Sequence, residues 1–413
     1  MAKDYPQHGV PMVEFLPFKG LIPKLSDAEE IGDRVSPPYD VIGDDEKVRL
    51  QSIDHNITRI ILGAKDGKYD GAAKELAKWI KEGALVSTEE DCYYLYRQSF
   101  VSHGRNLTRT GIMGRLRLES YDEGNILPHE ETFPKVKEDR LNLLRATSSH
   151  LESIFGTFDG VDKELAESLK GSVALFEFID PAGVSHSFRI IKKKKAVDQL
   201  RSILTTKKVL IADGHHRYET ALKYSLENPE DQEKRYVLTT LVASDDPGLV
   251  VEPTHRLLRS NGIPSEQFMN ATAKDFGIGE MRSMEDLGLA MSRSKRVMIG
   301  ILLEGGKIFA LDHLQPPNKD PMWSIDAYVC EELVIKPIQS SMPADNQMKV
   351  EYDHDLESVK AKMKTGEYDM AVILSPPKLE TIWALARSGR KMPKKSTYFY
   401  PKIWSGFVIY AMG

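Results

Sequence analysis

Four polar residues stand within five positions of the segment KKVLIADGHHRYETALKYSL, residues 207–226: Asp213, His215, His216 and Arg217. They directly follow the apolar run VLIA, and packing does not require such a set at one turn. Aspartate can hold Mg²⁺ or orient a hydroxyl, while the planar fork of arginine can bind two phosphate oxygens. The residue types therefore favour a site for a polyphosphate and its metal ion, with the histidines as further donors.

A buried strand and a helix are expected to position this turn. Residues 209–212 are short, apolar and partly β-branched, and the apolar residues after Gly214 recur at helical spacing up to Leu226. A helix start leaves backbone N–H groups unpaired at the positive end of the dipole, where phosphate binds. We expect Gly214, His215 and Arg217 to bind phosphate, and Asp213 to bind the metal.

Two alternatives remain open at this turn. Asp213 could act only as a helix cap, with the histidines packed inside or facing solvent. A zinc site is the other alternative, although the local sequence offers no third ligand beside the two histidines.

Further polar residues gather in LPHEETFPKVKEDRLNLL, residues 127–144. A carboxylate there, Glu130 in our assignment, could take a proton from a substrate hydroxyl, and Lys137 and Arg140 could neutralise phosphate. His129 is a candidate substrate contact. The alternative is a charged loop whose acidic residues start a helix.

Three more stretches are candidates for the same pocket. RVSPPYDVI, residues 34–42, is a rigid loop that could present Tyr39 and Asp40 to a substrate or only cross the surface. EPTHRLL, residues 252–258, offers Arg256 as a second anion contact. The candidate substrate contacts in that stretch are Thr254 and His255.

The basic and aromatic tract MPKKSTYFYPK covers residues 392–402. Such a tract can bind single-stranded nucleic acid. This one is short and the chain is acidic, so we favour a packed C-terminal segment that lends Lys395 or Ser396 to the pocket.

The composition limits the class of protein. The chain has 413 residues and a net charge of −5, so we expect two domains, residues 1–260 and 261–413, and no general attraction to nucleic acid or anionic membranes. Two distant cysteines argue against a disulfide framework, and we see no signal peptide or membrane span, so a cytoplasmic location is expected. The expected partner is a small-molecule substrate, and a homodimer is one option.

The periodicity predicts a mixed α/β (α+β) protein. Hairpins are expected over residues 92–118, 173–191 and 296–314, because paired β-rich runs flank turns that contain glycine. Helices are expected over residues 71–83 and 138–151, and after Gly214 over the apolar pattern from Tyr218 to Leu226. A strand near 370 followed by a helix adds a C-terminal α/β region.

Five motifs together resemble one known family. SPPYDVI, HEETFPKVKEDRLNLL, ADGHHRYETA, PTHR and MPKKSTYFYPK occur here in the order typical of the family called domain of unknown function 1015. The resemblance covers nearly the whole chain, but the family label names no reaction.

A more distant resemblance does suggest a reaction. DGHHR followed by a helix is similar to the phosphate-binding turn of the ParB/sulfiredoxin fold, some of whose members are free serine kinases. This implies a ParB/sulfiredoxin-like core with additional hairpins. It also implies that Asp213, His215, His216 and Arg217 hold the donor phosphates and Mg²⁺, with a carboxylate elsewhere as base.

The implied function is a small-molecule kinase. It would transfer a phosphoryl group from ATP, ADP or pyrophosphate to a hydroxyl metabolite such as free serine. The turn lacks the cysteine that sulfiredoxin needs, and we see no helix-turn-helix of the ParB kind. The alternatives are a nucleotide-binding regulatory protein without turnover and a metal-dependent hydrolase.

Overall fold

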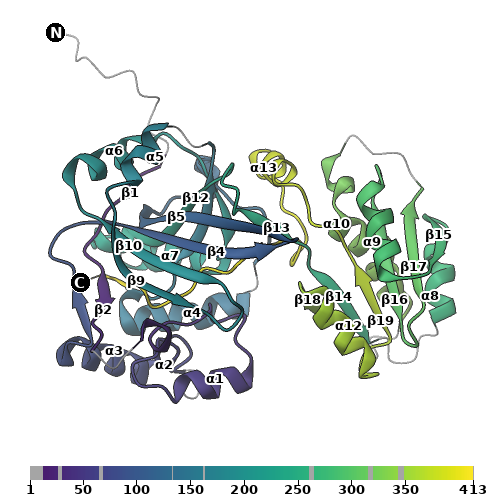
Figure 1. Ribbon diagram of the computed structural model, residues 1–413, viewed down its shortest axis with the longest axis horizontal. Coiled ribbons are helices and arrows are strands. Elements are labelled where there is room, and N and C mark those ends of the chain that lie inside the picture. Colours follow the sequence, from purple (N-terminus) through teal and green to yellow (C-terminus); the bar gives the residue numbers. More distant parts are fainter. Residues whose placement is uncertain are drawn as a thin grey trace, which may run out of the picture. The chain divides into compact units, whose positions relative to one another are not determined.

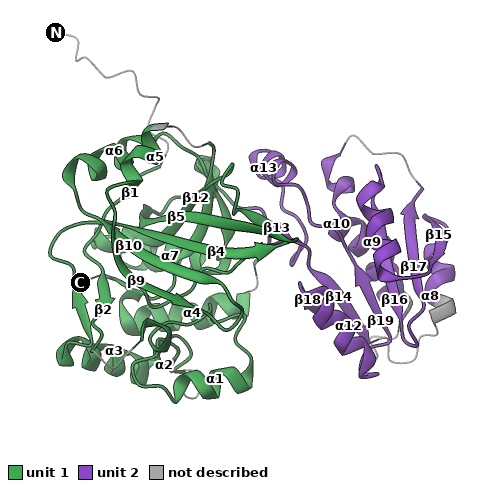
Figure 2. Ribbon diagram, viewed as in Figure 1, with its two compact units in different colours: residues 1–128, 132–250, 401–413 green, residues 129–131, 251–400 purple. Residues whose placement is uncertain are grey.

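The computed structural model describes residues 13–26, 30–64, 68–132, 134–160, 163–259, 265–314, 320–342 and 348–412. The chain divides into two compact units (Figure 2). The first comprises residues 1–128, 132–250 and 401–413, and the second comprises 129–131 and 251–400. A single boundary is expected from the sequence at residue 260. The first unit instead includes residues 132–250 and also the C-terminal segment, residues 401–413.

A mixed sheet forms the centre of the first unit (Figure 1). Among the described residues its strand order is β6-β11-β8-β12-β5-β4-β10-β9, with β1 paired to β5. These strands are β1 (Phe15–Leu16), β4 (Tyr93–Ser102), β5 (Arg105–Arg117), β6 (Ile126–Leu127), β8 (Ile154–Phe158), β9 (Val173–Ile179), β10 (Ser185–Ile191), β11 (Val209–Asp213) and β12 (Tyr236–Ala243).

Helices lie on both sides of this sheet, with α5 and α6 on one side and α3 and α4 on the other (Figure 1). The helices of the unit are α1 (Asp44–Gln51), α2 (Thr58–Ile61), α3 (Asp70–Glu82), α4 (Pro134–Thr147), α5 (Lys163–Leu169), α6 (Lys194–Thr205) and α7 (His215–Glu227). Two short strand pairs complete it: β2 (Leu21–Pro23) with β3 (Leu85–Ser87), and β7 (Ser149–His150) with β21 (Tyr410–Ala411).

The second unit has its own antiparallel sheet, in the order β15-β17-β16-β19-β14-β18 for the described residues. Its strands are β14 (His255–Arg259), β15 (Phe276–Met281), β16 (Met298–Leu303), β17 (Ile308–His313), β18 (Lys349–Asp353) and β19 (Met370–Ile373), and β13 (Val250–Glu252) pairs with β20 (Tyr398–Tyr400). Its helices are α8 (Ser265–Thr272), α9 (Met284–Arg293), α10 (Asp326–Cys330), α11 (Lys336–Ser341), α12 (Leu356–Lys364) and α13 (Leu379–Arg387).

Most of the local predictions are confirmed. The three hairpins form as β4–β5, β9–β10 and β16–β17, and α3 ends at Gly83, whose φ of 74° gives the expected left-handed C-cap. The helix expected at 138–151 instead runs from Pro134 to Thr147. Proline suits the first helical position, and Ser148, with φ of 44°, ends the helix before β7.

The C-terminal segment belongs to the first unit because its apolar side chains are part of that core. Phe407 is 1% exposed, and its ring lies 5.1 Å from Phe188 and 5.0 Å from Tyr96. Full burial of one such side chain contributes about 1.5–3 kcal/mol. This packing fixes residues 401–412 against the sheet and so determines where Lys402 lies.

No helix within the described ranges is both long enough and apolar enough to cross a membrane.

Gly156 in β8 tests the packing that holds β11 and β12 beside it. A Cβ at Gly156 would lie 2.8 Å from Val209 Cγ1 and 2.9 Å from Leu241 Cδ2. We expect Gly156→Ala to lower the free energy of unfolding by about 1–3 kcal/mol, as overpacked cores do. Urea denaturation measures the change.

Gly71→Ala is the matched control, because no atom lies within 4 Å of the Cβ position at Gly71 in α3. Alanine is more stable than glycine within a helix by about 0.5–1 kcal/mol, so this variant should be at least as stable as the wild type. A Gly156→Ala protein of unchanged stability would contradict the packing described above.

Candidate functional site

The predicted strand, glycine turn and helix are present as β11, Gly214 and α7. The pairing of β11 with β8 shifts register between Ile211 and Asp213, an irregularity of the kind that redirects a side chain at a strand end. Gly214 has φ of 93°, and a Cβ there would lie 3.1 Å from Arg217 Nη2. Two features therefore favour glycine at this position: the left-handed backbone conformation, and the Arg217 guanidinium group that occupies the space of a side chain.

Two cationic side chains converge on Asp213. Arg217 Nη2 donates to Asp213 Oδ2 at 2.8 Å, and Lys402 Nζ donates to Oδ1 at 2.7 Å. All three side chains are less than a fifth exposed. Burial opposes ionisation of the carboxyl, but the charges of Lys402 and Arg217 outweigh it and hold the pKa of Asp213 well below its usual range. Asp213 is thus ionised and both its oxygens accept hydrogen bonds.

Lys402 is positioned by the large sheet. Gln98 Nε2 donates to the Lys402 carbonyl at 2.8 Å. Arg109 Nη2 donates to two oxygens, Gln98 Oε1 and the Pro401 carbonyl. Arg109 is 1% exposed, and its guanidinium group lies 4.7 Å from the centre of the Phe155 ring. The side chains of β4 and β5 thereby bring the Lys402 ammonium group to the end of β11.

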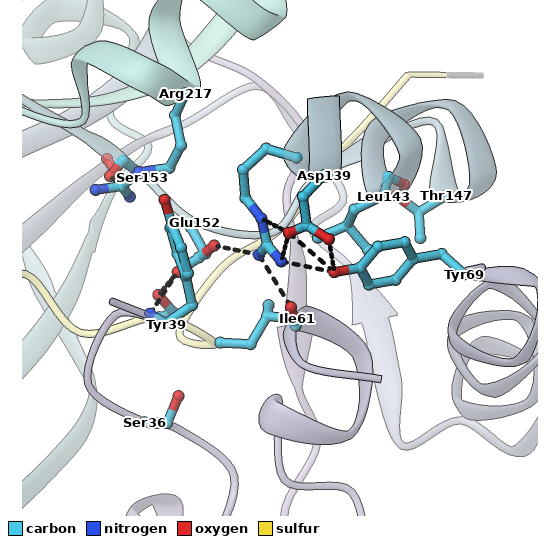
Figure 3. Close-up of polar contacts among 12 residues, drawn as sticks. Ser36, Tyr39, Ile61, Tyr69, Asp139, Leu143, Thr147, Glu152, Ser153 and Arg217 are labelled. Atoms are coloured by element: carbon cyan, nitrogen blue, oxygen red, sulfur yellow. Dashed lines mark hydrogen bonds and ion pairs between the residues drawn. The ribbon is translucent and has the colours of Figure 1, made fainter. Parts of the chain in front are cut away.

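The other guanidinium nitrogen of Arg217 reaches the segment that precedes β8. Arg217 Nη1 donates to the Ser153 carbonyl at 2.5 Å. The neighbouring Glu152 is 6% exposed, accepts a hydrogen bond from the Tyr39 N–H at 3.1 Å, and lies 3.7 Å from Arg140 Nη1. Figure 3 shows Tyr39, Glu152 and Arg217 together on one side of this network. The loop of Tyr39 is thus joined to the helix turn through Glu152.

Arg140 is fully engaged in this network. Its nitrogens donate to Asp139 Oδ2, to the Ile61 carbonyl at 3.0 Å and to the Tyr69 hydroxyl at 2.6 Å, and its guanidinium group lies 4.2 Å from the centre of the Tyr39 ring. Figure 3 shows Tyr69 and Asp139 on the far side of the network. Arg140 therefore fixes the Tyr39 loop against α4, and its expected phosphate contact stays a prediction.

A small cavity lies beside these groups. Its volume is about 40 Å³, and Arg140, Glu152, Arg217 and Thr220 are among its lining residues. A water molecule needs about 10–15 Å³ of this kind of space and two or more polar partners. The cavity is thus large enough for water next to Arg140 and Arg217.

The remaining predicted residues of the first unit lie on neighbouring elements. Lys137 Nζ donates to Glu219 Oε2 at 2.9 Å, so α4 and α7 are linked beside the turn. His215, which is 6% exposed, and the half-buried His216 form the first turn of α7. Asp40 is exposed in the loop after Tyr39.

The other predicted residues form a separate cluster in the second unit. His129 Nε2 is 3.0 Å from Thr397 Oγ1, and Glu130 Oε1 accepts from the Lys395 N–H at 2.8 Å. Arg256 is 2% exposed and donates to the carbonyls of Thr254 and Lys395. The motifs PTHR and MPKKSTYFYPK therefore bind one another, and the anion contact expected of Arg256 stays a prediction.

Two other residues of this cluster are buried. His255 Nδ1 accepts from the Leu374 N–H at 3.2 Å, and burial lowers the pKa of His255 to about 4, so the ring is neutral. Thr254 is 5% exposed, and its hydroxyl has no hydrogen-bond partner in the described part of the chain. Glu130 stays a prediction as the general base.

Within the ranges that the structure describes, no group of three or more His, Cys, Asp or Glu side chains could hold a metal ion. A Mg²⁺ ion bound mainly by substrate phosphates needs only one or two protein carboxylates. Asp213 at the helix start fits that smaller requirement.

Sequence reasoning did not identify Lys402, Gln98, Arg109 or Glu152 as parts of the site. In the sequence, Lys402 is only one basic residue of an aromatic tract, and Glu152 is the residue after a helix expected to end at Leu151. Fully buried arginine in a strand is rare, but burial of Arg109 cannot be recognised before the strand order is known.

The chain was compared with known proteins. The family described as "Protein of unknown function (DUF1015)" matches residues 15–328, and no curated protein matches the chain. A conserved hypothetical protein from Pyrococcus furiosus is similar over 73% of this chain and 95% of its own, with 14% identity and a TM-score of 0.39.

Two further solved structures are similar to a comparable extent. A free serine kinase in complex with AMP is similar over 69% of this chain and 89% of its own, with 14% identity and a TM-score of 0.38. SbnI with a C-terminal truncation, from Staphylococcus aureus, is similar over 72% and 87%, with 10% identity and a TM-score of 0.37. Likeness at this level carries no argument about the site or its chemistry.

Glu152 gives the site a measurable pH dependence. Burial raises the pKa of Glu152 despite the charges of Arg217 and Arg140, so folding favours the protonated form. Its contribution to stability is complete below the unfolded pKa, about 4.3, and is lost as the pH rises through the folded value. We expect Glu152→Gln to gain stability relative to the wild type as the pH rises above about 4.3.

Urea denaturation across that pH range measures the difference in free energy of unfolding. Asp213 does not interfere, because its lowered pKa affects stability only below about pH 3.9. Glu164→Gln, at an exposed residue of α5, is the control and should track the wild type at every pH. A Glu152→Gln difference that stays constant with pH would refute the burial argument.

Proposed function

Because the chain belongs to the family described as "Protein of unknown function (DUF1015)", whose name states no reaction, we propose a function from its own residues: a small-molecule kinase. The first unit would bind the phosphates of ATP, ADP or pyrophosphate at Gly214. The acceptor would be the hydroxyl group of a small metabolite, with free serine as the first candidate.

One observation supports the proposal above the others. Arg217 and Lys402 both converge on Asp213 directly at the start of α7. The N-terminus of a helix of this length carries about half a positive charge and unpaired N–H groups. A phosphate group has the charge, the size and the acceptor oxygens to use these donors together.

In the proposed reaction the acceptor hydroxyl oxygen forms a bond to the terminal phosphorus of the donor. The bond from that phosphorus to the bridging oxygen breaks, and the shortened donor leaves with the electron pair. The hydroxyl proton passes to a carboxylate base. Transfers of this kind depend mainly on positioning and on charge stabilisation.

The chain's own groups would supply that stabilisation. Arg217 and Lys402 would move part of their hydrogen bonding from Asp213 to the phosphate oxygens, while Gln98 and Arg109 keep Lys402 in place. Mg²⁺ bound to the donor would offset its phosphate charge, and Asp213 is the carboxylate placed to hold it. Tyr39 and Asp40, on the loop fixed by Glu152, would contact the acceptor.

The resemblance of DGHHR to the turn of the free serine kinases supports the same class of reaction. A free serine kinase has been solved in complex with AMP, and we propose a nucleotide for the present turn on the residues named above. A regulatory protein that binds nucleotide without turnover would share the phosphate contacts but yield no product.

A substrate screen tests the proposal directly. We expect purified protein with Mg²⁺ and ATP, ADP or pyrophosphate to phosphorylate at least one hydroxyl compound in a panel of amino acids and polyols. Mass spectrometry detects the product. Asp213→Asn should abolish turnover while it tightens Mg²⁺-free binding of the donor, because Arg217 and Lys402 no longer share the carboxylate with the phosphate.

Circular dichroism and urea denaturation establish whether Asp213→Asn is folded. Donor binding without product from any acceptor would favour the regulatory alternative. Undiminished turnover by a folded Asp213→Asn protein would refute the role given to this carboxylate.

Lys402→Met tests the long-range contribution to the phosphate site. Charged hydrogen bonds contribute about 1.5–3 kcal/mol each, so we expect donor affinity to fall at least tenfold, as measured by isothermal titration calorimetry. Lys195→Met removes an exposed lysine of α6 and is the matched control. Equal affinity for the two variants would exclude Lys402 from the phosphate site.

A further inference from the structure

Another cavity lies in the first unit, between the large sheet and α5. Its volume is about 240 Å³, far more than one water molecule needs. Residues of β5 and β12 form its floor and residues of α5 form its cover. The apolar part of the lining includes Ile112, Phe158, Leu165, Leu169 and Leu241.

The cavity opens on the sheet face opposite to Asp213. Side chains alternate between the faces of a strand. Thr110 and Ile112 line the cavity. Arg109, the neighbour of Thr110 on β5, points to the opposite face of the sheet, where it contacts the Pro401 carbonyl and the Phe155 ring. A ligand here would therefore be separate from the phosphates proposed at Gly214.

One cation in the wall of the cavity, Arg97, has no anionic partner among the described residues. Arg97 is half-buried and, within the described part of the chain, has no hydrogen-bond or ion-pair partner. Its cross-strand neighbours are Thr110 on β5 and Ser187 on β10. An arginine placed at the edge of an apolar cavity without an acceptor indicates that a ligand supplies one.

The other charged residues of the lining already have partners. Asp246 accepts from the backbone N–H groups of Thr110, at 3.1 Å, and Gly248, at 2.8 Å. Its main charged neighbours are Arg109 and Asp245 rather than Arg97. Lys170 Nζ is 2.6 Å from Glu167 Oε2. Arg97 thus remains the group that determines the ligand's charge.

We propose that this cavity binds a small monocarboxylic acid with an apolar tail. The carboxylate would lie on the guanidinium group of Arg97, and the tail would pack against Ile112, Phe158, Leu165 and Leu241. A polyphosphate would meet apolar walls and the Asp246 carboxylate. A neutral apolar molecule would leave Arg97 without an acceptor, so the amphipathic anion satisfies both parts of the lining.

Binding of octanoate to the full-length protein tests the proposal by isothermal titration calorimetry. Octanoate carries both features, 1-octanol lacks the charge and acetate lacks the tail. We expect octanoate to bind at least tenfold more tightly than either comparison compound. No octanoate binding, or equal affinity for octanoate and 1-octanol, would overturn the proposal.

Two variants locate the site. Arg97→Gln should weaken octanoate binding at least tenfold and leave 1-octanol binding unchanged, and Ala166→Trp, at an exposed lining residue of α5, should weaken both by closing the cavity. Arg105→Gln removes an exposed arginine of β5 outside the lining and should bind octanoate as the wild type does. Octanoate affinity unaffected by both Arg97→Gln and Ala166→Trp would place the ligand elsewhere and refute the site.

Discussion

The convergence of Lys402 and Arg217 on the single carboxylate of Asp213 is the interaction on which the candidate site depends. Each partner comes from a different part of the first unit: the end of β11, the first turn of α7 and the C-terminal segment. A buried carboxylate is unfavourable unless cations or hydrogen bonds compensate it. The ion pairs therefore fix the turn and concentrate positive charge where a helix begins.

The surroundings of this group explain why it is rigid. Arg109 and Gln98 hold the backbone of the C-terminal segment, while Phe407 packs its apolar side into the sheet core. On the other side, Arg217 is bonded to the Ser153 carbonyl, next to Glu152. A site whose cations are fixed in advance loses little energy in reorganisation when an anion binds.

The five sequence motifs are divided between the two compact units. SPPYDVI, the helix that follows HEETFP and the DGHHR turn lie in the first unit, joined through Glu152, Arg140 and Glu219. PTHR, the residues 129–131 and most of MPKKSTYFYPK lie in the second, joined through Arg256 and Lys395. The last motif is divided between the units, since Pro401 and Lys402 return to the first. The residues that the sequence groups into one candidate site thus lie in two units. Arg140 and Arg256 each hold segments of their own unit together.

The sequence by itself determined the mixed α/β class, the three hairpins, and the turn that places Asp213, Gly214 and Arg217 together. These features depend on residues a few positions apart, so periodicity and turn chemistry are sufficient to predict them. Only the tertiary structure decided that Lys402, 189 residues from Asp213, is its partner, and that Arg140 donates to the carbonyl of Ile61. The physical reason is that burial and charge pairing depend on which distant segments pack together, and neither is encoded in the local pattern around a single residue.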